Sequence, residues 1–100
     1  MEFVNLTPHE IRLNDGRSFP PSGTVARVQQ NFFNLDQDIC QAEFGEVEGL
    51  PEPRPDVMLI VSAMVLAATA RDDVVAPATG HPECIRNERG HIVSVPCFIQ

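Results

Sequence analysis

Apolar residues run almost without interruption from Val57 to Ala70, VMLIVSAMVLAATA, and charged residues follow at once. The first part, Met58–Val61, is branched and apolar, which predicts a buried strand. Ser62 then precedes strong helix formers, so we expect it to cap a helix over Ala63–Ala70. This helix is apolar on every side, and one small sheet cannot cover it. We therefore expect a homodimer or a larger homo-oligomer.

Short strands are predicted on both sides of this run. Asn14-Asp15-Gly16 is a hairpin turn signal, whereas residues 29–41 are polar and favour no element, with a loop expected at 34–36. The prolines of residues 49–55 exclude a helix or an inner strand there. Strands are expected at residues 3–6, 10–13, 17–19, 24–28, 43–47, 58–61, 73–77, 84–87 and 91–95.

These elements predict one α+β domain over residues 1–100, in which a small, mainly antiparallel sheet packs around one apolar central helix. A domain of this size buries only about two thirds of the surface of its unfolded chain, so its core is expected to be thin.

Charge narrows the possible partners. The chain has seven arginines, no lysine and fourteen acidic residues, with a formal net charge of -7. Duplex nucleic acid needs a basic face and is therefore not expected as a partner. Arginine without lysine suits guanidiniums placed to bind a small anion, although the codon bias of a GC-rich genome explains the same composition.

Location follows from the apolar run and from the cysteines. The run is shorter than the roughly 20 residues that span a bilayer, and the N-terminus lacks the pattern of a signal peptide. Cys40, Cys84 and Cys97 are an odd number of cysteines without close pairing, which suits reduced thiols. We expect a cytoplasmic protein without membrane contact.

The first candidate site is the segment Asn5-Leu6-Thr7-Pro8-His9. If the segment is extended, Asn5, Thr7 and His9 project to one side and form a polar wall for a ligand. The alternative is a strand end at the surface, where Asn5 or Thr7 satisfies the backbone of a turn.

A second candidate is the turn at Ser22 and Gly23, followed by Arg27. Gly23 permits a positive φ, and exposed N–H groups beside the Ser22 hydroxyl can form a nest for an anion. A plain turn explains these two residues equally. Arg27 lies in an expected apolar strand, where its charge needs a partner or a ligand.

The predicted helix carries the third candidate, with Ser62 at its start and Arg71 and Asp73 after its end. Eight helical residues span about 12 Å, so Ser62 and Arg71 do not share a site within one subunit. An antiparallel helix of a second subunit would bring them together. Alternatively, Arg71 neutralises the helix C-terminus and pairs with Asp73.

The last candidate group is His81, Cys84, His91 and Cys97, which are possible zinc ligands. Their spacing lacks the paired knuckles of zinc modules. No third group or oxyanion hole accompanies Cys84 and His81 as a nucleophile and its base. We expect no metal, no cofactor and no enzymatic activity.

Several stretches of the chain resemble the recurring motifs of a family of small phage- and prophage-encoded proteins. These motifs are N-L-T-P-H near the start, P-S-G-x-x-A-R, I-V-S before a helix, R-x-D after it and R-[ND]-x-x-G-x-I near the end. Here they correspond to VNLTPHEIRL, PPSGTVARV, LIVSAMVLAA, RDDVVAP and IRNERGHIVSV, and GEVEGLPEP belongs to the same pattern.

Accessory phage proteins of this size include the Thoeris and CBASS anti-defence sponges, which bind nucleotide second messengers of bacterial immunity without hydrolysing them. The resemblance thus implies a phage anti-defence protein in the host cytoplasm that sequesters a cyclic nucleotide or a cyclic ADP-ribose type of signal. It implies that Arg27, Arg71 and the Ser62 turn bind phosphates, and that Asn5, Thr7, His9 and Asp73 bind ribose or base edges. The alternative is a phage structural or interaction module without a small-molecule ligand.

Overall fold

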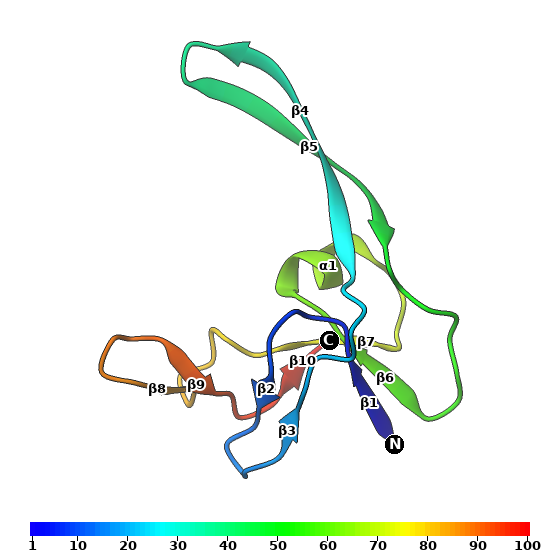
Figure 1. The fold of residues 1–100 in the computed structure, drawn as a ribbon, viewed down its shortest axis with the longest axis vertical. Helices are drawn as coiled ribbons and strands as arrows, with labels where there is room; N and C mark the ends of the chain where they lie inside the picture. The colour runs from blue at the N-terminus through cyan, green and yellow to red at the C-terminus, as the bar shows by residue number, and fades with distance from the viewer.

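The computed structural model describes residues 1–100 and is organised around a four-stranded sheet (Figure 1). The strand order is β1 (Glu2–Asn5), β6 (Val57–Ile60), β7 (Val74–Pro77) and β10 (Phe98–Ile99). Strands β1, β6 and β7 are parallel to one another, and β10 pairs antiparallel with β7. Helix α1 (Ala63–Ala68) connects β6 to the parallel strand β7, so the apolar run of the sequence forms most of a βαβ unit.

One face of this sheet holds the main core, beneath α1. In the register of the sheet, Val4 lies opposite Leu59, and Leu59 lies opposite Val74. Val65 is the buried residue of α1. The buried cluster is small and apolar and consists of Leu6, Ala26, Leu59, Val61, Val65 and Val74.

The opposite face of the sheet is covered by aromatic rings and a short hairpin. Phe3, Phe19 and Phe98 form a triangle with ring centroids 5.2 to 5.6 Å apart. Phe19 belongs to the hairpin of β2 (Ile11–Arg12) and β3 (Ser18–Phe19). A second hairpin, β8 (Ile85–Arg86) and β9 (Ile92–Ser94), joins the first through a bridge between Leu13 and Val95.

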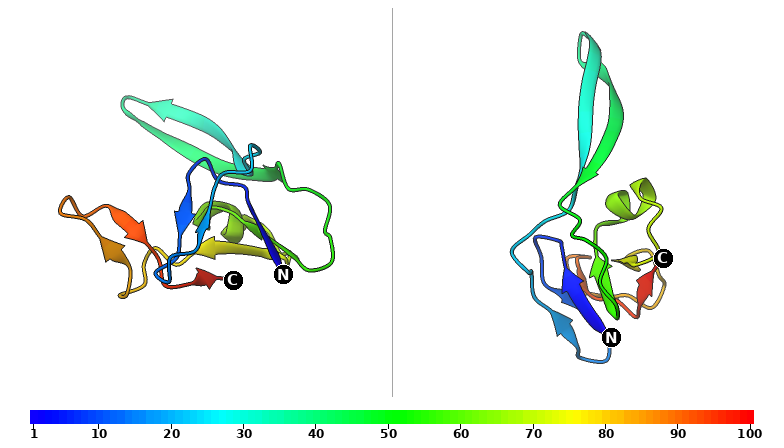
Figure 2. Two further views of the ribbon diagram at one scale, coloured as in Figure 1. Left: turned by 60° about the horizontal axis from the view of Figure 1, so that its bottom comes forward. Right: turned by 90° about the vertical axis from the view of Figure 1, so that its right-hand side faces the viewer.

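A long hairpin projects from this body. Strands β4 (Arg27–Asp36) and β5 (Ile39–Glu48) contain 10 residues each, and beyond their base nearly every residue is exposed. Figures 1 and 2 show this hairpin, here called the arm, standing clear of the other strands in every view. The radius of gyration is 15.4 Å, compared with about 13 Å for a compact chain of this length.

Several expectations from the sequence are confirmed. Ser62 is the N-cap of α1, and its side chain accepts a hydrogen bond from the Val65 N–H. The turn at residues 14–16 joins two paired strands, and the last two expected strands form a hairpin. The fold is a small, mainly β structure with one short helix.

Other expectations were wrong. The helix ends at Ala68 rather than Ala70 and covers one face of the sheet instead of forming a centre. Antiparallel pairs of strands outnumber parallel pairs, as expected. However, the sheet on which α1 packs contains both kinds of pair. Residues 34–36, expected to be a loop, belong to β4. Residues 29–41, for which the sequence favoured no element, form most of the arm, because cross-strand pairing stabilises polar residues with no strand pattern of their own.

No helix has the length and hydropathy that a membrane span requires, since α1 contains only 6 residues.

Gly49 closes the base of the arm. It has a φ of 88°, and a Cβ added there would lie 2.6 Å from the carbonyl oxygen of Val25. The close approach of these two backbones joins the end of β5 to the chain that enters β4.

We predict that Gly49→Ala lowers the free energy of unfolding by about 1–3 kcal/mol, because it adds a backbone clash to a strained φ. Urea unfolding followed by far-ultraviolet circular dichroism measures this loss. Gly80→Ala is the control, since a Cβ at Gly80 meets nothing within 4 Å. An equal loss of stability in both variants would contradict the close backbone contact at Gly49.

Candidate functional site

A cavity of about 300 Å³ lies between α1, the start of β4 and the loop that follows β1. Three candidate residues from separate segments line it, namely Thr7, Arg27 and Ser62. The rest of its lining is apolar apart from the backbone and consists of Leu6, Pro8, Val25, Ala26, Val28, Met64 and Val65.

Arg27 supplies the charge of this cavity. It opens β4 and is exposed, so the expectation of an arginine within an apolar strand was wrong. Its guanidinium forms no ion pair, whereas four other arginines each pair with a carboxylate: Arg12, Arg17, Arg54 and Arg71. Arg27 therefore keeps its planar set of donors available to an anion.

Ser62 lines the cavity from the junction between β6 and α1. Its Oγ accepts from the Val65 N–H at 3.3 Å. The hydroxyl hydrogen makes no bond within the chain and can be donated to a ligand.

Thr7 is placed by Asn5. The Oδ1 of Asn5 accepts from the backbone N–H of Thr7 at 2.9 Å and from its hydroxyl at 2.7 Å. The Nδ2 of Asn5 donates to the carbonyl oxygens of His9 and Phe19, both at 2.8 Å. Both residues are buried, at 2% and 7% exposure.

The expected polar wall of Asn5, Thr7 and His9 is therefore not formed. The carboxamide of Asn5 is fully used inside the protein, and its role is to hold the turn after β1. The side chain of His9 lies in a separate hollow beside β2 and β9. Of the three residues, Thr7 alone borders the cavity, and its hydroxyl is held by Asn5 and by the backbone of His9.

The expected anion nest at Ser22 and Gly23 is not available either. Gly23 has the expected positive φ, 101°. However, the Ser22 N–H already donates to the Asn5 carbonyl at 3.0 Å. Ser22 borders another hollow, of about 480 Å³, together with Arg54.

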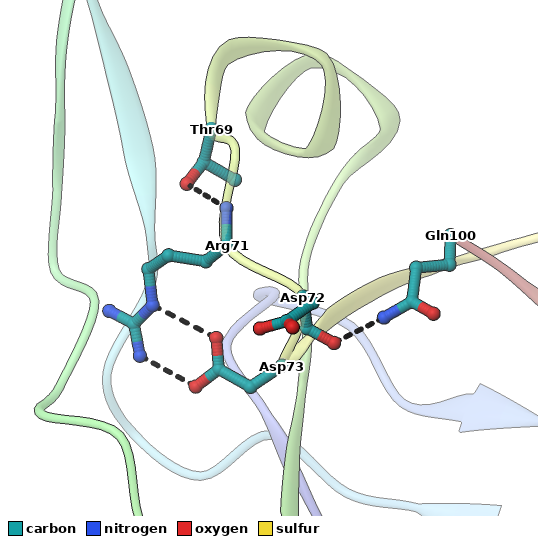
Figure 3. A network of polar contacts seen from close by, with 5 residues as sticks. All are labelled: Thr69, Arg71, Asp72, Asp73 and Gln100. Carbon is teal, nitrogen blue, oxygen red and sulfur yellow. Dashed lines mark hydrogen bonds and ion pairs between the residues drawn. The ribbon is translucent and has the colours of Figure 1, made fainter.

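Arg71 and Asp73 lie beyond the far end of α1 and bind each other (Figure 3). Arg71 donates through Nε to Oδ1 of Asp73 at 2.9 Å and through a terminal nitrogen to Oδ2 at 2.7 Å. Arg71 borders a hollow of about 650 Å³ that includes neither Arg27 nor Ser62. The alternative that Arg71 pairs internally is thus the one that the geometry supports, and the two arginines do not share a site in one chain.

This ion pair shifts both titrations. The hydrogen bonds from Arg71 hold the pKa of Asp73 below its usual range, and those with Asp73 raise the pKa of Arg71. The side chains are 27% and 19% exposed, so water screens them only in part.

Histidines and cysteines form no metal centre here. No group of three or more histidine, cysteine, aspartate or glutamate side chains is arranged to hold a metal ion. His81 accepts through Nδ1 from the Glu83 N–H at 3.0 Å, and the Cys84 thiol donates to the Ala78 carbonyl at 3.0 Å. All three cysteines are free.

The apolar lining was missed by reasoning from the sequence. Pro8 belongs to the segment expected to form a polar wall and Met64 to the expected helix, and neither pattern predicts a place on a cavity. The available signal was a methionine two residues after the expected cap, and the structure leaves Met64 52% exposed. Comparison of the chain with known protein families, with curated proteins and with solved structures finds no match.

We predict that Asn5→Ala lowers the free energy of unfolding by about 2–4 kcal/mol, because it leaves buried partners without hydrogen bonds. Chemical unfolding measures the loss. Asn87→Ala is the matched control: Asn87 Oδ1 also accepts two backbone N–H groups, from Arg89 and His91, but it is exposed. Water replaces those bonds, so the control should lose less than about 1 kcal/mol.

A second prediction concerns pH. Because the pKa of Asp73 is lowered in the folded state, its contribution to stability is present above the unfolded pKa of about 3.9. It is lost as the pH falls through the folded value. Asp73→Asn should therefore lower stability at about pH 7 and lose less further stability on acidification to about pH 3 than the wild type.

Unfolding by urea at the two pH values measures this difference. Asp15→Asn is the control, since Asp15 pairs with Arg17 at the same spacing but with side chains 55% and 63% exposed. Asp15→Asn should lower the free energy of unfolding at about pH 7 by less than Asp73→Asn does. An Asp73→Asn protein with the pH dependence of the wild type would contradict the assignment.

Proposed function

We propose that the chain binds a small nucleotide-derived anion in the cavity of Thr7, Arg27 and Ser62 and holds it without hydrolysis. The observation that carries the proposal is the convergence of an unpaired guanidinium and a free hydroxyl hydrogen on one partly apolar hollow. A planar guanidinium binds phosphate through two hydrogen bonds. The apolar wall, with Met64 and Val28, suits the flat face of a base.

The size of the cavity limits the ligand. Its volume of about 300 Å³ is at the lower end of the range for small-molecule sites. It therefore accommodates one nucleotide unit, and a cyclic dinucleotide would need a second cavity from another copy of the chain.

The lining favours binding over catalysis. No histidine, cysteine, aspartate or glutamate borders the cavity, so no ordinary general base lies beside a bound phosphate. Arg71 and Asp73, which bind each other elsewhere, have no part in this site.

Together with the sequence resemblance, this chemistry supports a phage anti-defence role. The ligand would be an immune signal of the cyclic nucleotide or cyclic ADP-ribose type, met in the cytoplasm of the host cell. The proposed active form is a homodimer or a larger homo-oligomer, and no membrane or nucleic acid duplex takes part.

The arm supports a second candidate function, a structural or protein-interaction module. Phe32, Leu35 and Ile39 on the arm are 65%, 75% and 76% exposed. Apolar side chains on a projecting hairpin are typical of a contact with another protein.

We predict that a panel of cyclic nucleotides and ADP-ribose derivatives contains a ligand that raises the melting temperature, and that it is recovered intact after denaturation. Arg27→Ala should weaken its binding by about 10- to 150-fold, since a charge-assisted hydrogen bond contributes about 1.5–3 kcal/mol. Titration calorimetry measures the change.

Arg89→Ala is the control, because the Arg89 guanidinium also forms no ion pair but lies away from this cavity. It should bind as the wild type does. Recovery of a hydrolysed ligand would mean that the protein is an enzyme. If no compound in the panel binds, the interaction module replaces this proposal.

A further inference from the structure

We infer that the outer edge of β4 is the surface on which a second copy of this chain docks, by antiparallel pairing of the two β4 strands about a two-fold axis. The inference rests on the homo-oligomer of the proposed function and specifies its interface. Within one chain, β4 pairs with β5 and with no other strand. The backbone groups on the outer edge of β4 therefore have no partner in the fold.

The edge of β4 lacks the charges and prolines by which many proteins protect such edges, although its pairing with β5 is irregular between Val28 and Gln30 and between Phe33 and Asp36. From Val28 to Leu35 it contains no charged residue and no proline, although lysine, other charges and proline are the usual safeguards. The other edge of the arm is protected. Strand β5 carries Glu43, Glu46 and Glu48.

Charge points to the chain itself as the occupant. Two copies each carry a net charge of -7, so they associate best where neither presents a carboxylate. Pairing β5 with its own copy would bring Glu43 and Glu46 near like charges, which destabilises cross-strand pairs. Pairing β4 with its own copy brings together Gln, Asn and Phe side chains instead.

The two-fold symmetry also specifies the centre of the contact. An isologous antiparallel pair places its central residue beside the same residue of the partner copy. We place Asn31 at this centre, because it lies in the segment Gln30–Phe33, whose register with β5 is regular. This segment supplies the hydrogen bonds of the contact.

Both faces of the arm offer apolar surface next to this edge. Phe32 lies opposite Ala42, and Phe33 lies opposite Gln41, so neighbouring rings project to opposite faces. On one face, the apolar surface continues to α1 through a hollow of about 220 Å³ lined by Val28, Phe44, Met64, Ala67 and Ala68.

The exposed area is large enough to matter for a dimer. Phe32, Phe33 and Phe44 are 65%, 43% and 56% exposed. Taking about 200 Å² for a whole phenylalanine, they expose about 330 Å² of apolar surface per chain. Leu35 and Ile39 near the tip raise this toward the roughly 800 Å² that each partner buries in a stable interface.

Light scattering with refractive-index detection tests the inference on the full chain. At micromolar concentration the wild type should have twice the mass of 11.0 kDa. Asn31→Lys places two like charges at the centre of the contact, so we expect association at least about 10-fold weaker and a mass of one chain. Asn31 is exposed, and circular dichroism should show an unchanged fold.

Gln41→Lys is the matched control. It makes the same charge change on the same arm but on β5, and it should leave the dimer intact. A wild type of one-chain mass, or an Asn31→Lys protein of two-chain mass, would overturn the inference. So would equal dissociation of both variants, which would point to a face of the arm. If another protein rather than a second copy of the chain binds the arm, we expect the first of these results, a wild type of one-chain mass.

Nucleotide binding separates this inference from the proposed function. The cavity of Thr7, Arg27 and Ser62 is formed within one chain, so Asn31→Lys should retain the thermal shift given by a single nucleotide unit. If the wild type is a dimer and no nucleotide of the panel binds, the interface is correct and the sequestering function is wrong. If the wild type has the mass of one chain and binds a nucleotide, the sequestering function is correct and the interface is wrong.

Discussion

The carboxamide of Asn5 joins the turn after β1 to the hairpin of β2 and β3. It accepts from Thr7 and donates to the backbone of His9 and of Phe19, 14 residues away. Because Asn5 is 2% exposed, water cannot replace these bonds, and the turn after β1 has a single arrangement. The backbone carbonyl of Asn5 also receives the Ser22 N–H. The N-terminal hairpin, the aromatic face of the sheet and the Thr7 wall of the cavity all depend on this one side chain.

Around that turn the protein is built from a small core and extended surface. Only 15 of 100 residues are buried, and the largest apolar cluster, of 6 residues, includes residues from β6, β7 and α1. The chain then places 20 residues in an arm that adds almost nothing to this core. A strand pair without a packed face is marginally stable alone. The arm therefore has the least support within the chain, while the body folds around its own core.

Electrostatics divides the arginines by role. Most are neutralised locally, and the pair of Arg71 and Asp73 ties the end of α1 to the start of β7 (Figure 3). Arg27 alone combines an unpaired guanidinium with a place on the cavity of Thr7 and Ser62. An acidic protein can thus receive an anion, because local geometry rather than net charge sets the potential within a few ångströms of the guanidinium.

The sequence by itself determined the elements that depend on neighbours along the chain. The branched run of β6, the Ser62 cap and the turn at residues 14–16 could be predicted because local propensity and turn chemistry decide them. The sequence indicated Thr7, Arg27 and Ser62 as candidates in three separate segments, but it did not predict that they line one cavity. Tertiary structure alone decided that Asn5 is buried and binds the Phe19 carbonyl, that Arg71 lies away from the cavity of Arg27, and that residues 29–41 extend as an arm. These outcomes depend on pairing and burial between segments distant in the sequence, and such long-range contacts leave no periodic pattern in the residues that make them.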